Sequence, residues 1–216
     1  MITNLPISIT GVVHIGAHRG EELDEHRALG AKKIVWVEAN PEVYGELLYN
    51  IGESDIDNIM LLAACGDIDD DTVRFNVIYG PDAGFMTGNK GCSSLLEPVG
   101  RFIPWHKDII EIKAVTIDTL LKRNNLDYED FQLLELDVQG AELRVLRGAT
   151  ELLKHVDYIS TEATFWDPDY KDNTMYEDLE NFLNQAGFCY AETRYPDGVI
   201  NWADVLFIRK EVYDNL

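Results

Sequence analysis

The stretch Val13-His14-Ile15-Gly16-Ala17-His18-Arg19-Gly20, followed by the apolar run Ile34-Val35-Trp36-Val37-Glu38, decides the fold. The first apolar run stops at a glycine, a short loop opens a helical pattern, and the second run ends on an acid. Because glycine has no Cβ, the backbone can turn sharply there and come close to a ligand. The acid stands near the spacing at which a carboxylate binds a ribose diol. The stretch therefore predicts the first half of a nucleotide-binding α/β domain.

The composition favours one soluble domain over residues 1–216. The chain has 18 Lys and Arg against 39 Asp and Glu, a formal net charge of −21. Such a chain is repelled by phosphate backbones and anionic membranes, so we expect no nucleic acid and no membrane as partner. Three scattered cysteines and an N-terminus without a signal-peptide pattern predict reduced thiols and a cytoplasmic location.

Short apolar runs alternate with helical patterns, which is typical of a mostly parallel sheet with helices on both faces. The turn Pro196-Asp197-Gly198 joins the last two strands and predicts a C-terminal antiparallel hairpin at the edge of the sheet, unlike an all-parallel dehydrogenase fold. Residues 79–105 are rich in Gly, Pro and Ser but contain Phe85, Met86, Phe102 and Trp105, so we expect a lid or substrate loop there. The expected strands are 12–15, 33–38, 59–63, 72–77, 110–115, 132–137, 158–162, 189–195 and 203–209, and the expected helices are 21–29, 42–51, 117–124, 141–147 and 175–186.

The glycine loop departs from the three-glycine dinucleotide fingerprint. His18 stands at the second glycine position and Glu21 at the third. Acids in the first turn of a helix compete with phosphate for its free N–H groups. The loop therefore favours a ligand with adenosine and no phosphate, namely S-adenosylmethionine, with its amino acid end on the glycine turn and its ribose on Glu38. A plain tight turn would explain Gly16 alone, and Glu38 could instead cap the following helix.

A second apolar strand ends on an acid in Leu133-Leu134-Glu135-Leu136-Asp137. Asp137 is expected to face the crevice, where it could orient the ligand's amino group, hold a substrate hydroxyl or take its proton. Glu142, in the first turn of the next helix, could act as a second base or complement the helix dipole. After the third strand, Asp67 could reach an adenine amine or belong to a tight turn. Asp137, Glu142 and Glu162 could converge on a divalent ion, but their spacing does not require one, so no metal is assigned.

These motifs together resemble the FkbM family of S-adenosylmethionine-dependent methyltransferases. The resemblance spans residues 11–165 and implies a Rossmann-like methyltransferase fold and methyl transfer to a hydroxyl oxygen of a sugar or natural-product-like acceptor. It also implies a cofactor site at Gly16, Ala17, His18, Glu38 and Cys65, and places Ser93, Ser94, Asp137 and Glu142 near the methyl group or the acceptor. The matching elements are His14 to Gly20, Glu38-Ala39-Asn40-Pro41, Ala64-Cys65-Gly66-Asp67, Cys92-Ser93-Ser94-Leu95, Val115-Thr116-Ile117-Asp118-Thr119-Leu120, Leu136-Asp137-Val138-Gln139-Gly140-Ala141-Glu142, and Glu162.

The chain departs from the family pattern at three positions. Where members often have an acid, a lysine and a glutamate, it has His14, Glu135 and Gln139. These departures leave a non-catalytic binding module open beside the enzyme, and a nicotinamide-dependent oxidoreductase is a third reading. In the methyltransferase, Asp137 would be the first candidate base and Glu142 the second. Of the histidines, only His18 is expected near the site; His26, His106 and His155 are expected to be exposed, without a role.

Overall fold

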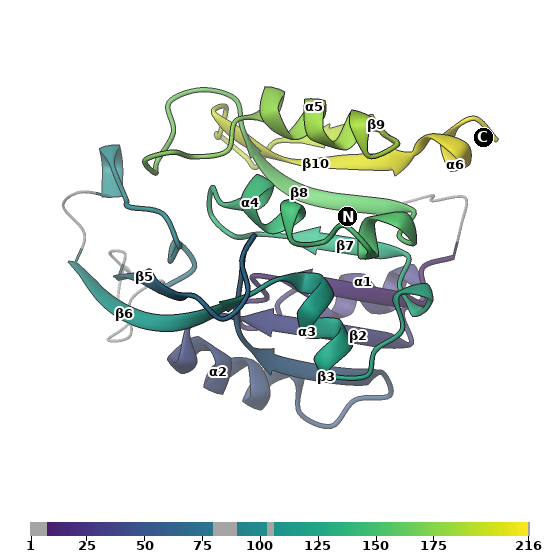
Figure 1. The fold of residues 1–216 in the computed structure, drawn as a ribbon, viewed down its shortest axis with the longest axis horizontal. Coiled ribbons are helices and arrows are strands. Elements are labelled where there is room, and N and C mark those ends of the chain that lie inside the picture. Colours follow the sequence, from purple (N-terminus) through teal and green to yellow (C-terminus); the bar gives the residue numbers. More distant parts are fainter. Residues whose placement is uncertain (1–7, 80–89, 103–105, 216) are drawn as a thin grey trace.

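The computed structural model describes residues 8–79, 90–102 and 106–215. Its main sheet has seven strands in the order β3-β2-β1-β7-β8-β10-β9 (Figure 1). The chain switches from one side of β1 to the other at β7, and β3, β2, β1, β7 and β8 all run parallel. The bounds are β1 (Gly11–Ile15), β2 (Lys33–Glu38), β3 (Asp57–Leu62), β7 (Leu133–Leu136) and β8 (Tyr158–Thr164). The predicted mostly parallel α/β sheet is confirmed.

The C-terminal hairpin completes this sheet. Its strands are β9 (Phe188–Arg194) and β10 (Trp202–Arg209), and β10 pairs antiparallel with both β8 and β9. The hairpin is confirmed and occupies the edge of the sheet. Its reversed strand is the second from the edge, because β10 inserts between β8 and β9.

Two predicted strands belong to a separate small sheet. β5 (Thr72–Tyr79) and β6 (His106–Val115) form an antiparallel pair, and β4 (Ala64–Cys65) adds to β6 in the order β4-β6-β5. This pair extends away from the main sheet, beside the ends of β1 and β2 (Figure 1). Most of the expected lid, residues 80–89 and 103–105, lies outside the described residues, including Phe85, Met86 and Trp105.

Helices pack on both faces of the main sheet, as predicted. α1 (Leu23–Leu29) and α2 (Pro41–Ile51) share an apolar core with alternate residues of β1 and β2, including Val12 and Ile34. The opposite residues of the same strands, including Val13 and Val35, pack against the other helices. Those helices are α3 (Ile117–Arg123), α4 (Glu142–Arg147) and α5 (Tyr176–Gln185); the short elements are α6 (Lys210–Tyr213), η1 (Gly100–Phe102), η2 (Tyr128–Asp130) and η3 (Leu152–Lys154).

Helix starts follow the local sequence signals. The side-chain oxygen of Asn40 accepts a hydrogen bond from the backbone N–H of Glu42, and Pro41 occupies the first helical position of α2.

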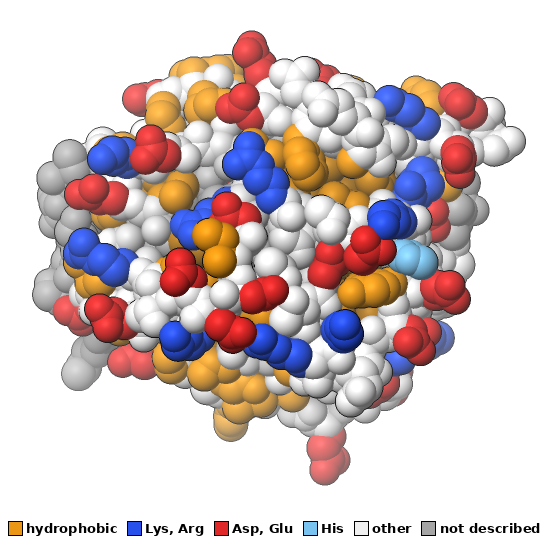
Figure 2. Space-filling view, in the orientation of Figure 1, with side chains coloured by type: hydrophobic (Ala, Val, Ile, Leu, Met, Phe, Trp, Pro, Cys, Tyr) orange, Lys and Arg blue, Asp and Glu red, His pale blue; other side chains and the backbone are white. Residues whose placement is uncertain are grey.

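None of the helices among the described residues is long and apolar enough to cross a bilayer. On the face drawn in Figure 2, described Lys and Arg side chains lie among acidic ones rather than in one continuous patch.

Candidate active site

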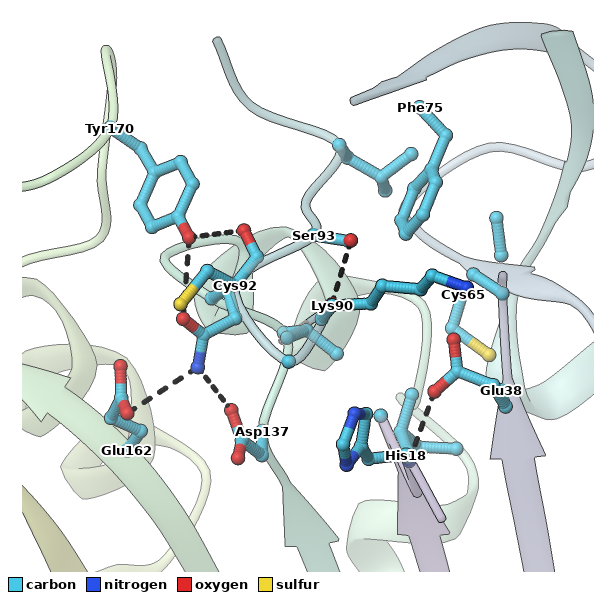
Figure 3. Close-up of a pocket in the computed structure, with 18 of the residues that line it drawn as sticks. His18, Glu38, Cys65, Phe75, Lys90, Cys92, Ser93, Asp137, Glu162 and Tyr170 are labelled. Carbon is cyan, nitrogen blue, oxygen red and sulfur yellow. Dashed lines mark hydrogen bonds between the residues drawn. The ribbon is translucent and has the colours of Figure 1, made fainter. Parts of the chain in front are cut away.

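A cavity of about 430 Å³ opens where β1, β2 and β7 end, beside the small sheet (Figure 3). Parallel sheets bind ligands at this edge, next to the point where the strand order reverses. Both acids that end the predicted strands, Glu38 and Asp137, line this one cavity. The two carboxylates therefore lie on either side of β1, because β2 and β7 are its two neighbours in the sheet.

The glycine loop brings β1 against the end of β7. Gly16 has a φ of +83°, and a Cβ there would lie 1.8 Å from the carbonyl oxygen of Asp137. Its N–H donates to the carbonyl of Val37 at 2.9 Å. Only glycine fits this contact, because any side chain would meet backbone. Gly16 lines the cavity, whereas Ala17 is fully buried in the core on the side of α1 and α2 and is not among the lining residues.

Glu38 already accepts two backbone hydrogen bonds. Its Oε2 accepts from the N–H of His18 at 3.0 Å and its Oε1 from the N–H of Asn40 at 2.6 Å. Since each carboxylate oxygen has two acceptor sites, each keeps one for a further donor. Burial raises the pKa of Glu38 to about 7, against the opposing effect of the two N–H donors. The carboxylate is thus fixed in place and can still accept from a pair of hydroxyls.

His18 lines the cavity in a left-handed conformation with a φ of 43°. Its Nδ1 lies 2.8 Å from a carboxylate oxygen of Glu21, and this contact raises the pKa of His18 although burial acts the other way. Its Nε2 is buried and has no hydrogen-bond partner among the residues the structure describes. Protonated His18 could therefore offer one N–H to an anionic group of a ligand.

Asp137 and Glu162 both contact the amide of Gln139, and dashed lines mark these two hydrogen bonds in Figure 3. The Nε2 of Gln139 donates to Oδ1 of Asp137 at 2.6 Å and lies 3.5 Å from Oε2 of Glu162. Asp137 faces the open cavity, yet the surrounding protein desolvates it and raises its pKa to about 6. Burial, with Asp137 nearby, raises the pKa of Glu162 well above its ordinary value. The difference between these two pKa values favours an ionised Asp137 beside a protonated Glu162 near neutral pH. In such a pair the ionised carboxylate can act as a base and the protonated one as an acid.

The amide of Gln139 is itself held in place. The hydroxyl of Tyr170 lies 2.5 Å from the carbonyl oxygen of Cys92 and 3.3 Å from Oε1 of Gln139. Both are acceptors, so one hydroxyl proton serves the two. Gln139 has a φ of 53°, an uncommon backbone conformation for a residue other than glycine. The hydrogen bonds from Tyr170 to Gln139 and from Gln139 to Asp137 thus fix the direction of the Asp137 carboxylate.

The remaining predicted residues divide between the cavity and its support. Ser93 lines the cavity, with its hydroxyl donating to the carbonyl of Lys90 at 2.7 Å. Ser94 is buried and not among the lining residues; it donates to the carbonyl of Gln139 at 2.8 Å and accepts from the N–H of Leu96. Its place is structural, because it ties the segment from residue 90 to the β7–α4 turn.

Glu142 does not line the cavity. It is 2% exposed, and its Oε1 accepts a hydrogen bond from the N–H of Gly140 at 3.0 Å. Glu142 thus binds a backbone N–H at the start of α4, in keeping with the alternative of a residue that complements the helix dipole. Cys65 does line the cavity, as a buried thiol whose pKa burial raises to about 12. Asp67 lies away from the cavity lining and pairs with Nε of Arg144 at 2.8 Å, so the possible adenine contact is not formed by this residue.

Several lining residues carry no sequence signal for the site. Phe75 comes from the small sheet and Arg101 from η1, whereas Lys90 and Tyr170 come from irregular segments. Lys90 pairs with Glu42 at 2.5 Å, and Arg101 with Asp169 at 2.6 Å. Lys90 and Arg101 lie in the connection between β5 and β6, and Tyr170 in the segment after β8, and no local pattern predicts how these segments fold back onto the sheet.

A second cavity, of about 600 Å³, covers the part of the sheet next to α1. The lining residues from β1, α1 and β7 include His14, His26 and Glu135. The expectation that His26 is exposed was wrong, because it is 1% exposed and packs against Trp36. Helix α1 is short, and the spacing of its apolar residues did not indicate that His26 faces inward.

Comparisons with known proteins agree with this geometry. The model of the methyltransferase FkbM domain matches residues 14–190. No curated protein matches the chain in sequence. Among solved structures, Streptococcus pneumoniae Sp1610 in complex with S-adenosyl-L-methionine is 10% identical, with a TM-score of 0.52 over 94% of this chain and 66% of that chain. M. capricolum TrmK in complex with S-adenosyl-homocysteine is 7% identical, with a TM-score of 0.52 over 93% of this chain and 62% of that chain.

Haemophilus influenzae TehB has the same fold, at 10% identity and a TM-score of 0.50 over 94% of this chain and 59% of that chain. The chain thus spans less than two thirds of the length of these three solved chains. At such identities the similarity shows the Rossmann-like fold alone. The family match covers most of the chain and confirms the resemblance seen in its motifs: this protein belongs to the FkbM family of methyltransferases.

Proposed function

We propose that this chain is an S-adenosylmethionine-dependent O-methyltransferase that acts on a small hydroxylated acceptor, such as a sugar or a natural product. The observation that carries the proposal is that Glu38 and Asp137 line one cavity on either side of the Gly16 turn. Two structures of the same fold, Sp1610 and TrmK, hold S-adenosyl-L-methionine and S-adenosyl-homocysteine.

The residues present fit this cofactor better than a dinucleotide. Two free acceptor sites on Glu38 suit a ribose diol, and the small side chains of Ala63 and Ala64 leave space at the cavity wall. Glu21 and Glu22 line the cavity beside the start of α1, where a pyrophosphate would meet negative charge. A volume of about 430 Å³ is ordinary for a site that binds a small molecule.

The cavity residues then have distinct tasks. When bound, the cofactor supplies a methyl group on a sulfonium sulfur. His18 and the Gly16 turn would hold its amino acid end, and Glu38 its ribose. Asp137 would accept the proton of the acceptor hydroxyl, because its pKa of about 6 leaves it ionised near neutral pH. Gln139 keeps the Asp137 carboxylate oriented, as its amide donates to Oδ1.

The charges favour a small acceptor over a nucleic acid. Sp1610 is described in connection with tRNA (m1A22) methylation. This chain, however, has a net charge of −21, and the two basic residues of the cavity, Lys90 and Arg101, are paired with acids. A polyphosphate backbone would be repelled at long range.

Release of S-adenosylhomocysteine tests the proposal. The purified chain is incubated with S-adenosylmethionine and a panel of sugars, hydroxylated natural products and a tRNA transcript. Turnover is expected with a hydroxylated small molecule, and Asp137→Asn is expected to lower kcat by about 10²–10⁴, the usual contribution of a general base. The exposed Asp178→Asn is the matched control and retains turnover. Turnover with tRNA alone, binding without any turnover, or tight binding of NAD in place of S-adenosylmethionine would each refute the proposal.

A further inference from the structure

Two histidines and a glutamate converge in the second cavity, which adjoins the first and shares Asp137 and Glu162 with it. His14 and Glu135 are direct neighbours across the β1–β7 pair, and His26 reaches them from α1. One nitrogen or oxygen atom from each residue lies within 4.8 Å of the other two. His14 Nδ1 lies 3.3 Å from His26 Nε2, which in turn lies 3.6 Å from Oε2 of Glu135.

Two of these separations match the spacing between ligand atoms in a metal site. Zinc binds imidazole nitrogen and carboxylate oxygen at about 2.0–2.1 Å, so the ligand atoms of a tetrahedral site lie about 3.3–3.4 Å apart. The observed 3.3 Å between the two nitrogens equals such an edge, and the 3.6 Å to Glu135 is close to it. The nitrogen–nitrogen distance is also slightly longer than the roughly 2.7–3.2 Å of ordinary N–H···O hydrogen bonds in proteins.

The three ligands also come from rigid elements. His14 and Glu135 are fixed by the pairing of adjacent strands, and both imidazoles pack against Trp36, with ring centroids 5.4 and 5.2 Å apart. His14 and His26 are 2% and 1% exposed, so neither side chain is an ordinary surface group. Rigid supporting elements of this kind favour a defined coordination geometry over chance proximity.

The open side of the cluster faces a cavity with many acids. Of the residues lining it, Glu22, Glu25 and Asp204 add negative charge around the three ligands. A divalent cation would be attracted there and would offset part of that charge. The cavity, of about 600 Å³, leaves room for water at a fourth coordination position.

We propose that His14, His26 and Glu135 bind one divalent transition-metal ion of the zinc class, with its fourth position open to the second cavity. Two imidazoles and one carboxylate are a ligand set that zinc uses with water as the fourth ligand. The proposal concerns ion binding by three residues to which the proposed methyl transfer assigns no role, although Asp137 and Glu162 also line this cavity.

Cobalt(II) is the probe, since its visible absorption reports ligand type and four-coordinate geometry. The metal-free full chain is titrated with CoCl₂ and then with ZnCl₂. One equivalent of cobalt is expected to give the d–d bands of a tetrahedral nitrogen–oxygen site without the sulfur charge-transfer band that Cys65, Cys92 or Cys189 would cause. Zinc is expected to remove the bands.

The variants locate the ion. Glu135→Gln and His14→Gln are each expected to weaken cobalt binding at least tenfold, whereas Glu177→Gln, an exposed change away from this cavity, changes it less than twofold. Glu135 is the decisive position, because it is only half-buried and its variant keeps the shape; circular dichroism confirms that it is folded. No uptake at 100 µM cobalt, or equal uptake by Glu135→Gln and the parent chain, overturns the proposal and leaves a His–His–Glu group sharing protons. Neither outcome bears on S-adenosylhomocysteine binding, which is measured separately.

Discussion

The contact between Gly16 and the backbone of Asp137 leads to a quantitative prediction. A Cβ at Gly16 would lie 1.8 Å from the carbonyl oxygen and 2.6 Å from the carbonyl carbon of Asp137, where ordinary contacts lie at 3.4–4 Å. The φ of +83° adds a second cost for any L side chain. Gly16→Ala therefore introduces both strain in the loop and a collision with the end of β7.

Two other glycines separate these costs. Gly187 has a φ of +92° but nothing within 4 Å of its Cβ position, so Gly187→Ala carries the conformational cost alone, about 1–2 kcal/mol. Gly16→Ala adds a backbone displacement of about 1–3 kcal/mol, for a total of about 2–5 kcal/mol. Gly45 lies inside α2, also with open space around it, and Gly45→Ala is expected to stabilise the chain by about 0.5–1 kcal/mol.

Thermal and urea unfolding of the three variants check this order. At about 2–4 °C per kcal/mol for a chain of this size, Gly16→Ala should lower Tm by about 4–20 °C, Gly187→Ala by about 2–8 °C, and Gly45→Ala should raise it. Calorimetry with S-adenosylhomocysteine is expected to show lost binding in Gly16→Ala only. If Gly16→Ala were no less stable than Gly187→Ala, the close approach of the loop to Asp137 would be refuted.

Three further predictions concern buried polar groups. Glu38→Gln is expected to weaken S-adenosylhomocysteine binding about 10–100-fold in calorimetry, because hydrogen bonds to a charged group contribute about 1.5–3 kcal/mol. The exposed Glu53→Gln is the control, and equal affinity in the two variants would contradict the prediction. Burial raises the pKa of Glu142 to about 7, so its ionisation lowers the stability of the folded chain as pH rises from about 4.5 to 7. Glu142→Gln should remove roughly 3 kcal/mol of this pH dependence and keep turnover. A pH profile of melting temperatures that is the same in the variant and the parent chain would exclude the effect. Ser94→Ala should lower the free energy of unfolding in urea by about 1–3 kcal/mol, since the N–H of Leu96 loses its partner, and an unaltered midpoint would argue against it.

Most of the fold could be predicted because its signals are local. The apolar runs, the Pro41 helix start and the Pro196-Asp197-Gly198 turn each act within a few residues, and all five predicted helices are present to within two residues at each end. The small sheet could not be separated from the main one, because residues 72–77 and 110–115 have the same strand pattern as any other. Their antiparallel partner is fixed by a long connection whose path no local residue sets.

The residues of the site show the same difference between local signals, which could be predicted, and long-range contacts, which could not. Glu38 and Asp137 were predictable because strand ends meet at one edge of a parallel sheet. Ser94 and Glu142 carried the right motif but point their polar atoms into backbone, at the carbonyl of Gln139 and the N–H of Gly140. A motif specifies which residue is present, whereas the direction of its side chain depends on neighbours that only the folded chain brings together.

The three departures from the family pattern acquire a different weight in the structure. His14 and Glu135 are neighbours across one strand pair and face the second cavity. Only Gln139 lies at the reaction cavity, where its amide still contacts both Asp137 and Glu162. A glutamate there would place a third carboxyl between two acids, whereas the amide donates to them without adding charge. The departures therefore leave the proposed base and cofactor contacts intact, which favours an active methyltransferase over a binding module that only keeps the fold.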